Sequence, residues 1–419
     1  MPGTSKLRIL FLAAALGWMA IVNAVMLWNT RFQIQHGYGD FASFYTAGTQ
    51  VRRGLGIDLY NHAAQWRVQQ EFAAGVTIRQ SPLPYIRPPF EALLFSLFAA
   101  LPYPTALLLW TILKLALLVA IPFIVVRDRV RGRPWNEPIP LWAVGLLALG
   151  TFPEFMDLLM GQDAPLVALL FAIAYWQLDT HRDALAGFIL GLALFKFQLV
   201  IPFVIALLIA RRKRVLPGFA MAAIVVLAVS ERIVGWKGLL QYPRELMALN
   251  HTGNGLITPE NQINLRGLLI LFVGRVPYPG PIHWVLAPLA LAAIVYAGLL
   301  WRKAGDNFLP EGFGLAMIAA IVTSYYAYEY DLLSLMVPLL AILARSANAF
   351  PPDRTTRYLA ATGLLLLVMP LYWFTRVYLK AEFLMTLPLL CVGIALARRL
   401  HQAGARMVAG QPKSVLQVP

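Results

Sequence analysis

The chain is dominated by long runs of apolar residues, the first of which extends from Ile9 to Trp28. A helix of that length measures about 30 Å at about 1.5 Å per residue, which is enough to cross the hydrocarbon core of a bilayer. Only 13% of the 419 residues are charged, whereas soluble domains carry about 25%. The sequence therefore predicts a polytopic membrane protein.

The apolar runs are continuous and do not alternate with polar residues, which excludes a closed β-barrel and favours spanning helices. We expect an all-α transmembrane bundle. The apolar segments lie near residues 9–28, 89–102, 104–126, 139–152, 164–178, 184–196, 197–210, 217–234, 283–300, 311–325, 331–345, 357–373 and 382–398.

Clusters of Lys and Arg predict the orientation, because cytoplasmic loops of membrane proteins carry an excess of both. If both termini are cytoplasmic, the number of crossings is even, so one adjacent pair of segments, 89–126 or 184–210, makes a single net crossing. If 89–126 is the single net crossing, the chain makes about 12 crossings and three basic clusters lie on the cytoplasmic side. If 184–210 is the single net crossing, Arg127 to Arg133 lie outside. The three clusters are Arg127 to Arg133, His181-Arg182 and Arg211 to Arg214.

The formal net charge of +15 would suggest a nucleic-acid partner in a soluble protein, but an excess of Lys and Arg is typical of the cytoplasmic loops of membrane proteins, so we expect no nucleic-acid partner. The single cysteine, Cys391, excludes an intramolecular disulfide and a cysteine-based metal site. The six histidines show no paired spacing typical of a metal site. We therefore expect neither a metal ion nor a cofactor.

We expect one transmembrane domain over residues 1–400 and a cytoplasmic tail over 401–419. Two large loops, 29–88 and 235–282, should lie outside the cytoplasm. The first is rich in Tyr, Phe and Gly, a composition that favours an ordered segment and hence a site. Within it we predict a helix over 63–73 with Asn61 as its cap.

With this topology most acidic residues gather at the outer face, several of them within a few positions of an apolar run. An unpaired carboxylate is costly there, which favours a shared polar cavity over independent solvated positions. The candidates at this face include Asp40, Asp58, Glu154, Asp157, Asp163, Glu329 and Asp331.

Asp40 is the best single candidate for catalysis. It follows the first helix in the sequence Gly37-Tyr38-Gly39-Asp40-Phe41, where glycines permit an unusual turn. A carboxylate held there can act as a general base that removes a proton from an attacking hydroxyl. The alternative, an Asp that caps the following helix, fits the local sequence equally well.

Basic residues at the outer face are fewer. Arg87 precedes Pro88-Pro89, and Lys196 divides two apolar halves. A lysine at a helix centre costs about 2.5–3.5 kcal/mol, so Lys196 should mark a helix end or meet an anion such as a lipid phosphate. Arg266 is a third candidate for phosphate binding, although an ordinary interfacial arginine fits as well.

Several short motifs occur in an order that resembles glycosyltransferase family 87, a branch of the GT-C membrane glycosyltransferases. They lie over nearly the whole chain: Asp40-Phe41, Tyr45 to Gly48, Gly54 to Tyr60, Tyr85 to Phe90, Gly161-Gln162, Ala186-Gly187 with Gly191 and Lys196, and Asn261-Gln262. The sequence departs from the family at Tyr325 to Asp331, where a Trp or His often stands, so Glu329 or Asp331 would have to replace a histidine.

The resemblance implies a GT-C fold in the plasma (inner) membrane, with an extracytoplasmic active site beneath the first loop. It implies a polyprenyl-phosphate-sugar-dependent hexosyltransferase that delivers mannose, or else arabinofuranose, to an envelope glycolipid or glycan by inverting displacement. It also matches Asp40 to the catalytic base. Lys196, Arg87 and Arg266 are then candidates for binding the donor phosphate. Candidates for the donor and acceptor groove are Tyr45, Asp58, Tyr85, Glu154, Asp157, Gln162, Asp163, Asn261, Gln262, Glu329 and Asp331.

Two other functions are compatible with the composition. A transporter or lipid flippase of envelope precursors predicts ionisable residues at mid-helix, discontinuous helices and paired halves. A non-catalytic scaffold predicts a degraded Asp40 region. The charges at outer helix ends and the intact Asp40 motif favour the enzyme.

Overall fold

The computed structural model describes residues 3–73, 81–130, 150–251, 259–273, 282–346, 359, 363 and 369–408. Every regular element in these ranges is a helix and none is a strand, which confirms the all-α prediction. Most of the apolar segments 139–152 and 357–373 falls outside the described residues, as do residues 409–419 of the expected tail and parts of both expected outer loops.

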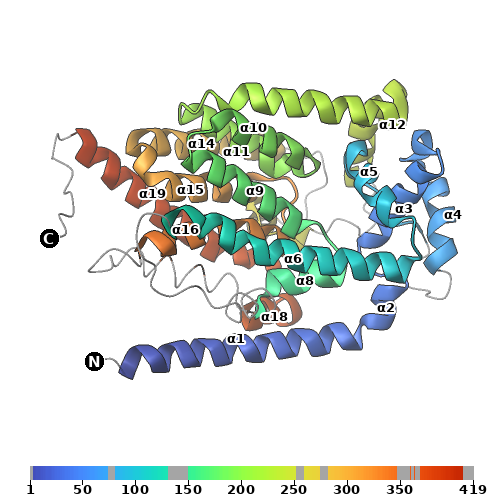
Figure 1. Ribbon diagram of the computed structural model, residues 1–419, viewed down its shortest axis with the longest axis horizontal. Coiled ribbons are helices and arrows are strands. Elements are labelled where there is room, and N and C mark those ends of the chain that lie inside the picture. Colours follow the sequence, from blue (N-terminus) through green and yellow to red (C-terminus); the bar gives the residue numbers. More distant parts are fainter. Residues whose placement is uncertain are drawn as a thin grey trace.

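Long helices lie roughly parallel along the longest axis of the molecule (Figure 1). Their packing buries a cluster of aromatic side chains, in which the Phe313 ring centroid lies 4.6 Å from that of Phe203 and 5.4 Å from that of Tyr175. The helices are α1 (Gly3–Asn29), α6 (Tyr103–Val130), α9 (Ala164–Asp179), α12 (Val215–His251), α14 (Ile282–Ala304), α15 (Leu309–Thr323), α16 (Met336–Ser346) and α19 (Thr386–Val408).

Five segments of the described chain are long and apolar enough to cross a membrane. They are Tyr103–Val125, Asp183–Ile209, Val215–Ala248, Trp284–Ala304 and Glu382–Met407. The expected total of about 12 crossings is not confirmed, because other apolar helices, such as Ala164–Asp179, have only 10–17 residues. A crossing needs about 20 residues.

The segment Asp183–Ile209 reaches the length of a crossing only as a whole, because it is not one straight helix but a hairpin whose two arms have 10 and 13 residues. It consists of α10 (Asp183–Leu192), the 3₁₀ turn η2 (Ala193–Lys196) and α11 (Phe197–Ile209). Arg212, just beyond α11, donates to Asp183 Oδ1 at 3.0 Å, whereas a continuous helix would hold its ends about 40 Å apart. The chain therefore reverses at Lys196, and His181-Arg182 lies at the same end of the bundle as Arg211 to Arg214.

The segment 89–126 contains one long helix. Before α6 stands α5 (Pro89–Phe98), which packs against α3 (Phe41–Arg52) at one end of the molecule (Figure 1). The two backbones touch where α3 has Gly48, since a Cβ there would overlap the backbone of Phe95. A ten-residue helix is too short to cross a bilayer, so α6 is the part of this segment that is long enough to do so.

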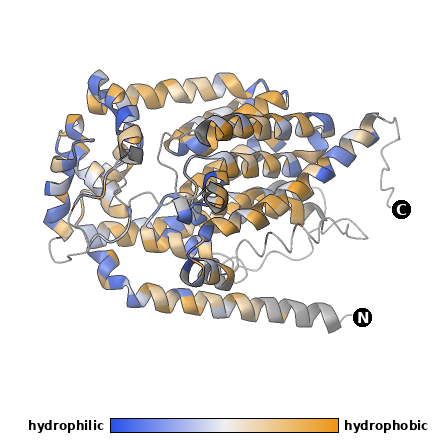
Figure 2. Ribbon diagram, turned by 180° about the vertical axis from the view of Figure 1, so that it is seen from behind, coloured by the Kyte–Doolittle hydropathy of each residue, from blue (hydrophilic) through white to orange (hydrophobic). Residues whose placement is uncertain are grey.

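The expected first loop folds into short helices at the end of the molecule that holds α3. They are α2 (Arg31–Gln35), α3, the 3₁₀ turn η1 (Gly56–Asp58) and α4 (His62–Ala73). The predicted helix and its cap are confirmed, because Asn61 Oδ1 accepts hydrogen bonds from the backbone N–H groups of Ala63 and Ala64. Hydrophilic residues gather in these helices (Figure 2). We call this end of the molecule the loop end.

The expected second loop is also largely helical where it is described. Gly235 has φ 66° and interrupts α12, which then continues to His251. The kink at Gly235 coincides with the expected start of the second loop, and the chain resumes a helix after it. Farther along lie η3 (Pro259–Asn261) and α13 (Leu265–Val273).

Short elements connect the long helices. They are α8 (Phe152–Met160), η4 (Asp306–Phe308), η5 (Glu329–Leu335), α18 (Met369–Trp373), the π-helical turn η6 (Phe374–Tyr378) and η7 (Glu382–Met385). The start of α1 and the end of α19 both lie at the end of the molecule opposite the loop end (Figure 1). We call this the termini end.

Candidate functional site

A cavity of about 320 Å³ lies at the loop end of the bundle. The segments that contribute to its wall are far apart in the sequence. The charged and amide side chains that line it are Asp40, Arg87, Gln162, Lys196, Gln198, Asn261, Glu329, Asp331, Arg376 and Glu382. Most of them belong to the set predicted from the sequence; Gln198, Arg376 and Glu382 do not.

Asp40 stands at the N-cap position of α3, but its side chain makes no capping hydrogen bond. Its Oδ2 instead accepts a hydrogen bond of 2.5 Å from Gln162 Nε2. The capping alternative therefore does not describe what this carboxylate does. Its position on the cavity wall leaves the base role open to it.

Two glycines allow Asp40 and Gln162 to meet. Gly161 ends α8 in the left-handed conformation with φ 67°, and a Cβ there would lie 2.6 Å from Phe41 Cβ. A Cβ on Gly39 would lie 2.6 Å from the carbonyl oxygen of Met160. The start of α3 and the end of α8 can approach this closely because neither position carries a side chain.

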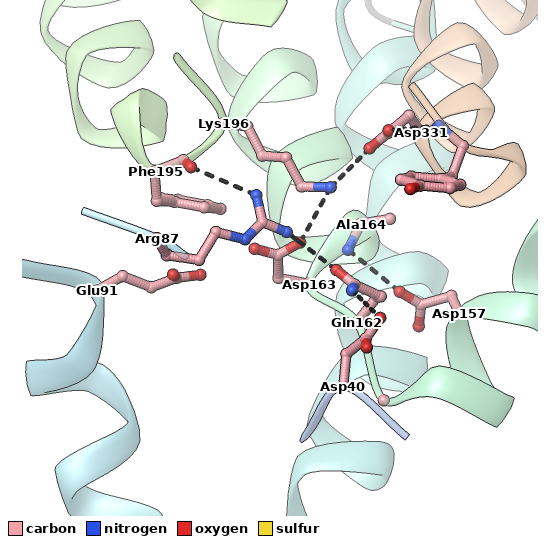
Figure 3. A network of polar contacts seen from close by, with 12 residues as sticks. Asp40, Arg87, Glu91, Asp157, Gln162, Asp163, Ala164, Phe195, Lys196 and Asp331 are labelled. Carbon is pink, nitrogen blue, oxygen red and sulfur yellow. Dashed lines mark hydrogen bonds and ion pairs between the residues drawn. The ribbon is translucent and has the colours of Figure 1, made fainter. Parts of the chain in front are cut away.

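Gln162 also connects Asp40 to the cations of the site (Figure 3). Its Oε1 accepts a hydrogen bond of 3.0 Å from Arg87 Nη2. The same Arg87 nitrogen lies 3.3 Å from Asp163 Oδ1, and Arg87 Nη1 donates to the carbonyl of Phe195. Arg87 is therefore fixed from two sides, by the turn before α9 and by the turn at the tip of the α10–α11 hairpin.

Lys196 lies at that hairpin tip and is 1% exposed. Its Nζ lies 2.6 Å from Asp331 Oδ1, 3.4 Å from Asp163 Oδ1 and 4.8 Å from the centre of the Tyr330 ring. Lys196 therefore ends a helical turn, and the anions that it meets among the described residues are carboxylates of the protein, while its role in phosphate binding stays a prediction. Lys196 has three N–H donors, so one remains after the two ion pairs.

The electrostatics of this network centre on Asp163. Burial would raise the pKa of Asp163, but the nearby charges of Arg87 and Lys196 outweigh burial and lower that pKa to about 2. Burial and the adjacent Asp163 carboxylate raise the pKa of Glu91 well above its usual range. Two cations, Arg87 and Lys196, thus face two carboxylates, Asp163 and Asp331.

A second ionic cluster on the cavity wall consists of Glu329, Arg376 and Glu382. Arg376 Nη1 lies 3.0 Å from Glu329 Oε1 and 2.8 Å from Glu382 Oε1. Both glutamates are nearly fully buried. Arg376 and Glu382 were not predicted from the sequence, since each stands next to an apolar run and has no motif around it. Their only sequence signal is the unusual charge beside a spanning segment.

Other predicted groove residues lie away from this cavity. Tyr45 lines a separate cavity of about 460 Å³ between α3, α4 and the start of α6, and Tyr85 donates to the carbonyl of Pro88. Asp157 is buried against Lys114 of α6, and its Oδ1 accepts from the N–H of Ala164.

Four further candidates have local roles. Asp58 accepts a hydrogen bond from Gln50 through its backbone carbonyl, and Glu154 is fully buried in α8. Gln262 is buried and accepts from Asn264 Nδ2. Arg266 lies 4.2 Å from the centre of the Tyr325 ring and does not line the cavity, and its role in phosphate binding stays a prediction.

Comparison with known proteins identifies the family of this chain. A search of the curated proteins found no match, and a search of the solved structures found none. The family model for glycosyltransferase family 87 matches residues 85–327, which is more than half of the chain. The match includes Arg87, Gln162 and Lys196, while Asp40 precedes it and Asp331 lies beyond its end. The chain therefore belongs to glycosyltransferase family 87 and is a multi-pass membrane glycosyltransferase.

Proposed function

We propose that this protein transfers mannose, or alternatively arabinofuranose, from a polyprenyl-phosphate carrier to a glycolipid or glycan of the cell envelope. The site would face the extracytoplasmic side of the plasma membrane, with both termini in the cytoplasm, and would use no metal or cofactor. The observation that carries the proposal is that one cavity holds both a carboxylate, Asp40, and the cations Arg87 and Lys196. Family membership favours this function over a transporter or a scaffold.

The chemistry would be a single displacement. Asp40 would take the proton of an acceptor hydroxyl as that oxygen attacks the anomeric carbon, and the bond from that carbon to the phosphate oxygen would break. Such a base contributes about 10²–10⁴-fold to the rate. Attack from the side opposite the leaving group inverts the anomeric configuration.

The departing phosphate gains negative charge, which the remaining N–H donors of Arg87 and Lys196 would stabilise. Both cations are already fixed by protein groups, so they need little reorganisation when the charge develops. The ion pairs with Asp163 and Asp331 leave this wall without excess positive charge. We therefore expect it to bind the phosphodiester of the donor weakly and the released phosphate more strongly.

The test is sugar transfer by purified protein in lipid nanodiscs, with polyprenyl-phosphate mannose and polyprenyl-phosphate arabinofuranose as donors and envelope lipid extract as acceptor. We expect Asp40→Asn to lower the rate about 10²-fold or more. Asp58→Asn is the matched control, because Asp58 belongs to the same loop but not to the cavity. Near wild-type transfer by Asp40→Asn would remove Asp40 from the base role, and no transfer from either donor by the wild type would refute the proposal.

A further inference from the structure

The cluster of Glu329, Arg376 and Glu382 has binding capacity that the described part of the protein does not use. Glu329 and Glu382 each direct one carboxylate oxygen, Oε1, to the same Arg376 nitrogen. The second oxygen of each carboxylate, Oε2, is buried without a hydrogen-bond partner among the described residues. A buried acceptor with no partner costs free energy, so this arrangement favours a ligand that supplies donors.

The charge of the cluster restricts the chemistry of that ligand. Two carboxylates surround one guanidinium, so an anionic group such as phosphate meets repulsion there. A neutral polyol fits better, because its hydroxyl groups donate to carboxylate oxygens and accept from the remaining N–H donors of the guanidinium. The side chains of Glu329 and Glu382 are 3% and 1% exposed, while that of Arg376 is 34% exposed, so the arginine is the accessible member.

The turn η5 connects this cluster to the cationic wall. Glu329 and Asp331 are two positions apart on η5: Glu329 holds Arg376, and Asp331 holds Lys196. In a sugar phosphate, the sugar ring and the phosphate group are likewise direct neighbours. One ligand can therefore place its phosphate beside Lys196 and its sugar hydroxyls beside Arg376.

We propose that Glu329, Arg376 and Glu382 form the subsite that binds the hydroxyl groups of the donor sugar, while Arg87 and Lys196 bind the phosphate. This subsite rests on the proposed function, since it assigns the sugar of the same carrier lipid. It makes these three residues determinants of sugar recognition and gives them no part in proton transfer.

The test compares lipids that differ only by the sugar. Binding is measured by titration with the protein in nanodiscs for four phosphodiesters of one polyprenol. The bare lipid carries a methyl group on the phosphate in place of a sugar, and the other three carry mannose, glucose or arabinofuranose. For the wild type we expect at least one sugar-bearing lipid to bind about tenfold more tightly than the bare lipid, because all four phosphates carry the same charge. For Glu382→Gln we expect that preference to fall about tenfold, with binding of the bare lipid unchanged, because hydrogen bonds to charged groups are of this strength.

Two controls make the result specific. Glu311→Gln alters another fully buried glutamate paired with an arginine, Arg399 at 3.1 Å, but at the termini end, so it should change neither affinity. Arg87→Gln should weaken all the lipids alike. If Glu382→Gln does not fold, the same lipids are compared with the variants Glu329→Gln and Arg376→Lys.

The possible outcomes distinguish a failure of the proposed subsite from a failure of the proposed function. Equal weakening of all lipids by Glu382→Gln, or no weakening, overturns the subsite. A wild type that binds the bare lipid as tightly as every sugar-bearing form also overturns it, while transfer activity would still support the proposed function. A wild type that binds none of these lipids overturns the proposed function itself.

Discussion

Asp40 Oδ2 and Gln162 Nε2 lie 2.5 Å apart, although 122 positions separate the two residues in the chain. The same amide accepts a hydrogen bond from Arg87 through its Oε1. One neutral side chain therefore orients both the candidate base and a candidate phosphate ligand. Because an amide N–H donates to the carboxylate, the contact favours the ionised form of Asp40, which a base requires.

Gln162→Glu should shift the pH dependence of sugar transfer. The new carboxylate faces Asp40 and disfavours its ionised form, which raises the pKa of Asp40. We expect the acidic limb of the pH–rate profile to move to higher pH and the rate at neutral pH to fall about tenfold or more. Gln198→Glu is the control, because Gln198 lines the same cavity without a side-chain hydrogen bond among the described residues. Identical profiles for both variants would contradict a link between Gln162 and the base.

Asp163→Asn should destabilise the protein and reduce the further loss of stability at low pH. Removing one partner from a buried ionic network costs about 3–5 kcal/mol. The pKa of Asp163 is about 2 in the folded protein, below its unfolded value of about 3.9, so its contribution is present above about pH 4 and is lost as pH falls toward 2.

Thermal unfolding followed by tryptophan fluorescence between pH 7 and pH 2 checks this prediction. The melting temperature of the wild type should fall more steeply below pH 4 than that of Asp163→Asn. Glu71→Gln breaks the exposed pair with Arg53 and should cost less than about 1 kcal/mol. Parallel acid profiles for wild type and Asp163→Asn would exclude Asp163 as the source of the acid sensitivity.

The packing of α10 against α12 should not tolerate added side chains. A Cβ on Gly187 would overlap the carbonyl oxygen of Val215, and a Cβ on Gly218 would overlap that of Ala184. We expect Gly187→Ala and Gly218→Ala each to cost about 1–3 kcal/mol or more, measured by thermal unfolding. Gly393→Ala on α19 meets only Ile318 Cγ2, at 3.2 Å, and should change stability by less than about 1 kcal/mol. Equal effects at all three positions would argue against this close approach.

The proposed orientation can be checked with single cysteines. In a Cys391→Ala background, Arg67→Cys places a thiol on α4 at the loop end, and Lys213→Cys places one at the termini end; both positions are exposed. On intact cells a membrane-impermeant maleimide should label Arg67→Cys, and it should label Lys213→Cys only after permeabilisation. The opposite labelling pattern would place the cavity on the cytoplasmic side.

Local sequence patterns determined the helical class and several details of the loop end. Continuous apolar runs leave no structure but helices in a bilayer, and Asn61 has the side chain and position of a helix cap. The charge and glycine pattern around Asp40 also marked the residue that lies on the cavity wall. These features depend on near neighbours in the chain, which the sequence displays directly.

The number of crossings could not be determined in the same way. An apolar run is compatible both with a spanning helix and with a shorter helix buried against protein, as α5 and α9 show. The hairpin at Lys196 is likewise evident only from the contact between Arg212 and Asp183. The hydrophobicity of a segment shows that it avoids water, but it does not show whether lipid or protein covers it.

The partners of the charged residues were decided by tertiary structure alone. The sequence identified Lys196 as a cation in apolar surroundings, but it could not show that Asp331, 135 positions away, neutralises it. Nor could it show that Arg376 and Glu382 reach the cavity that Asp40 lines. A buried charge must be compensated by whatever group the fold brings within about 4 Å, and that distance depends on how helices pack rather than on their order in the chain.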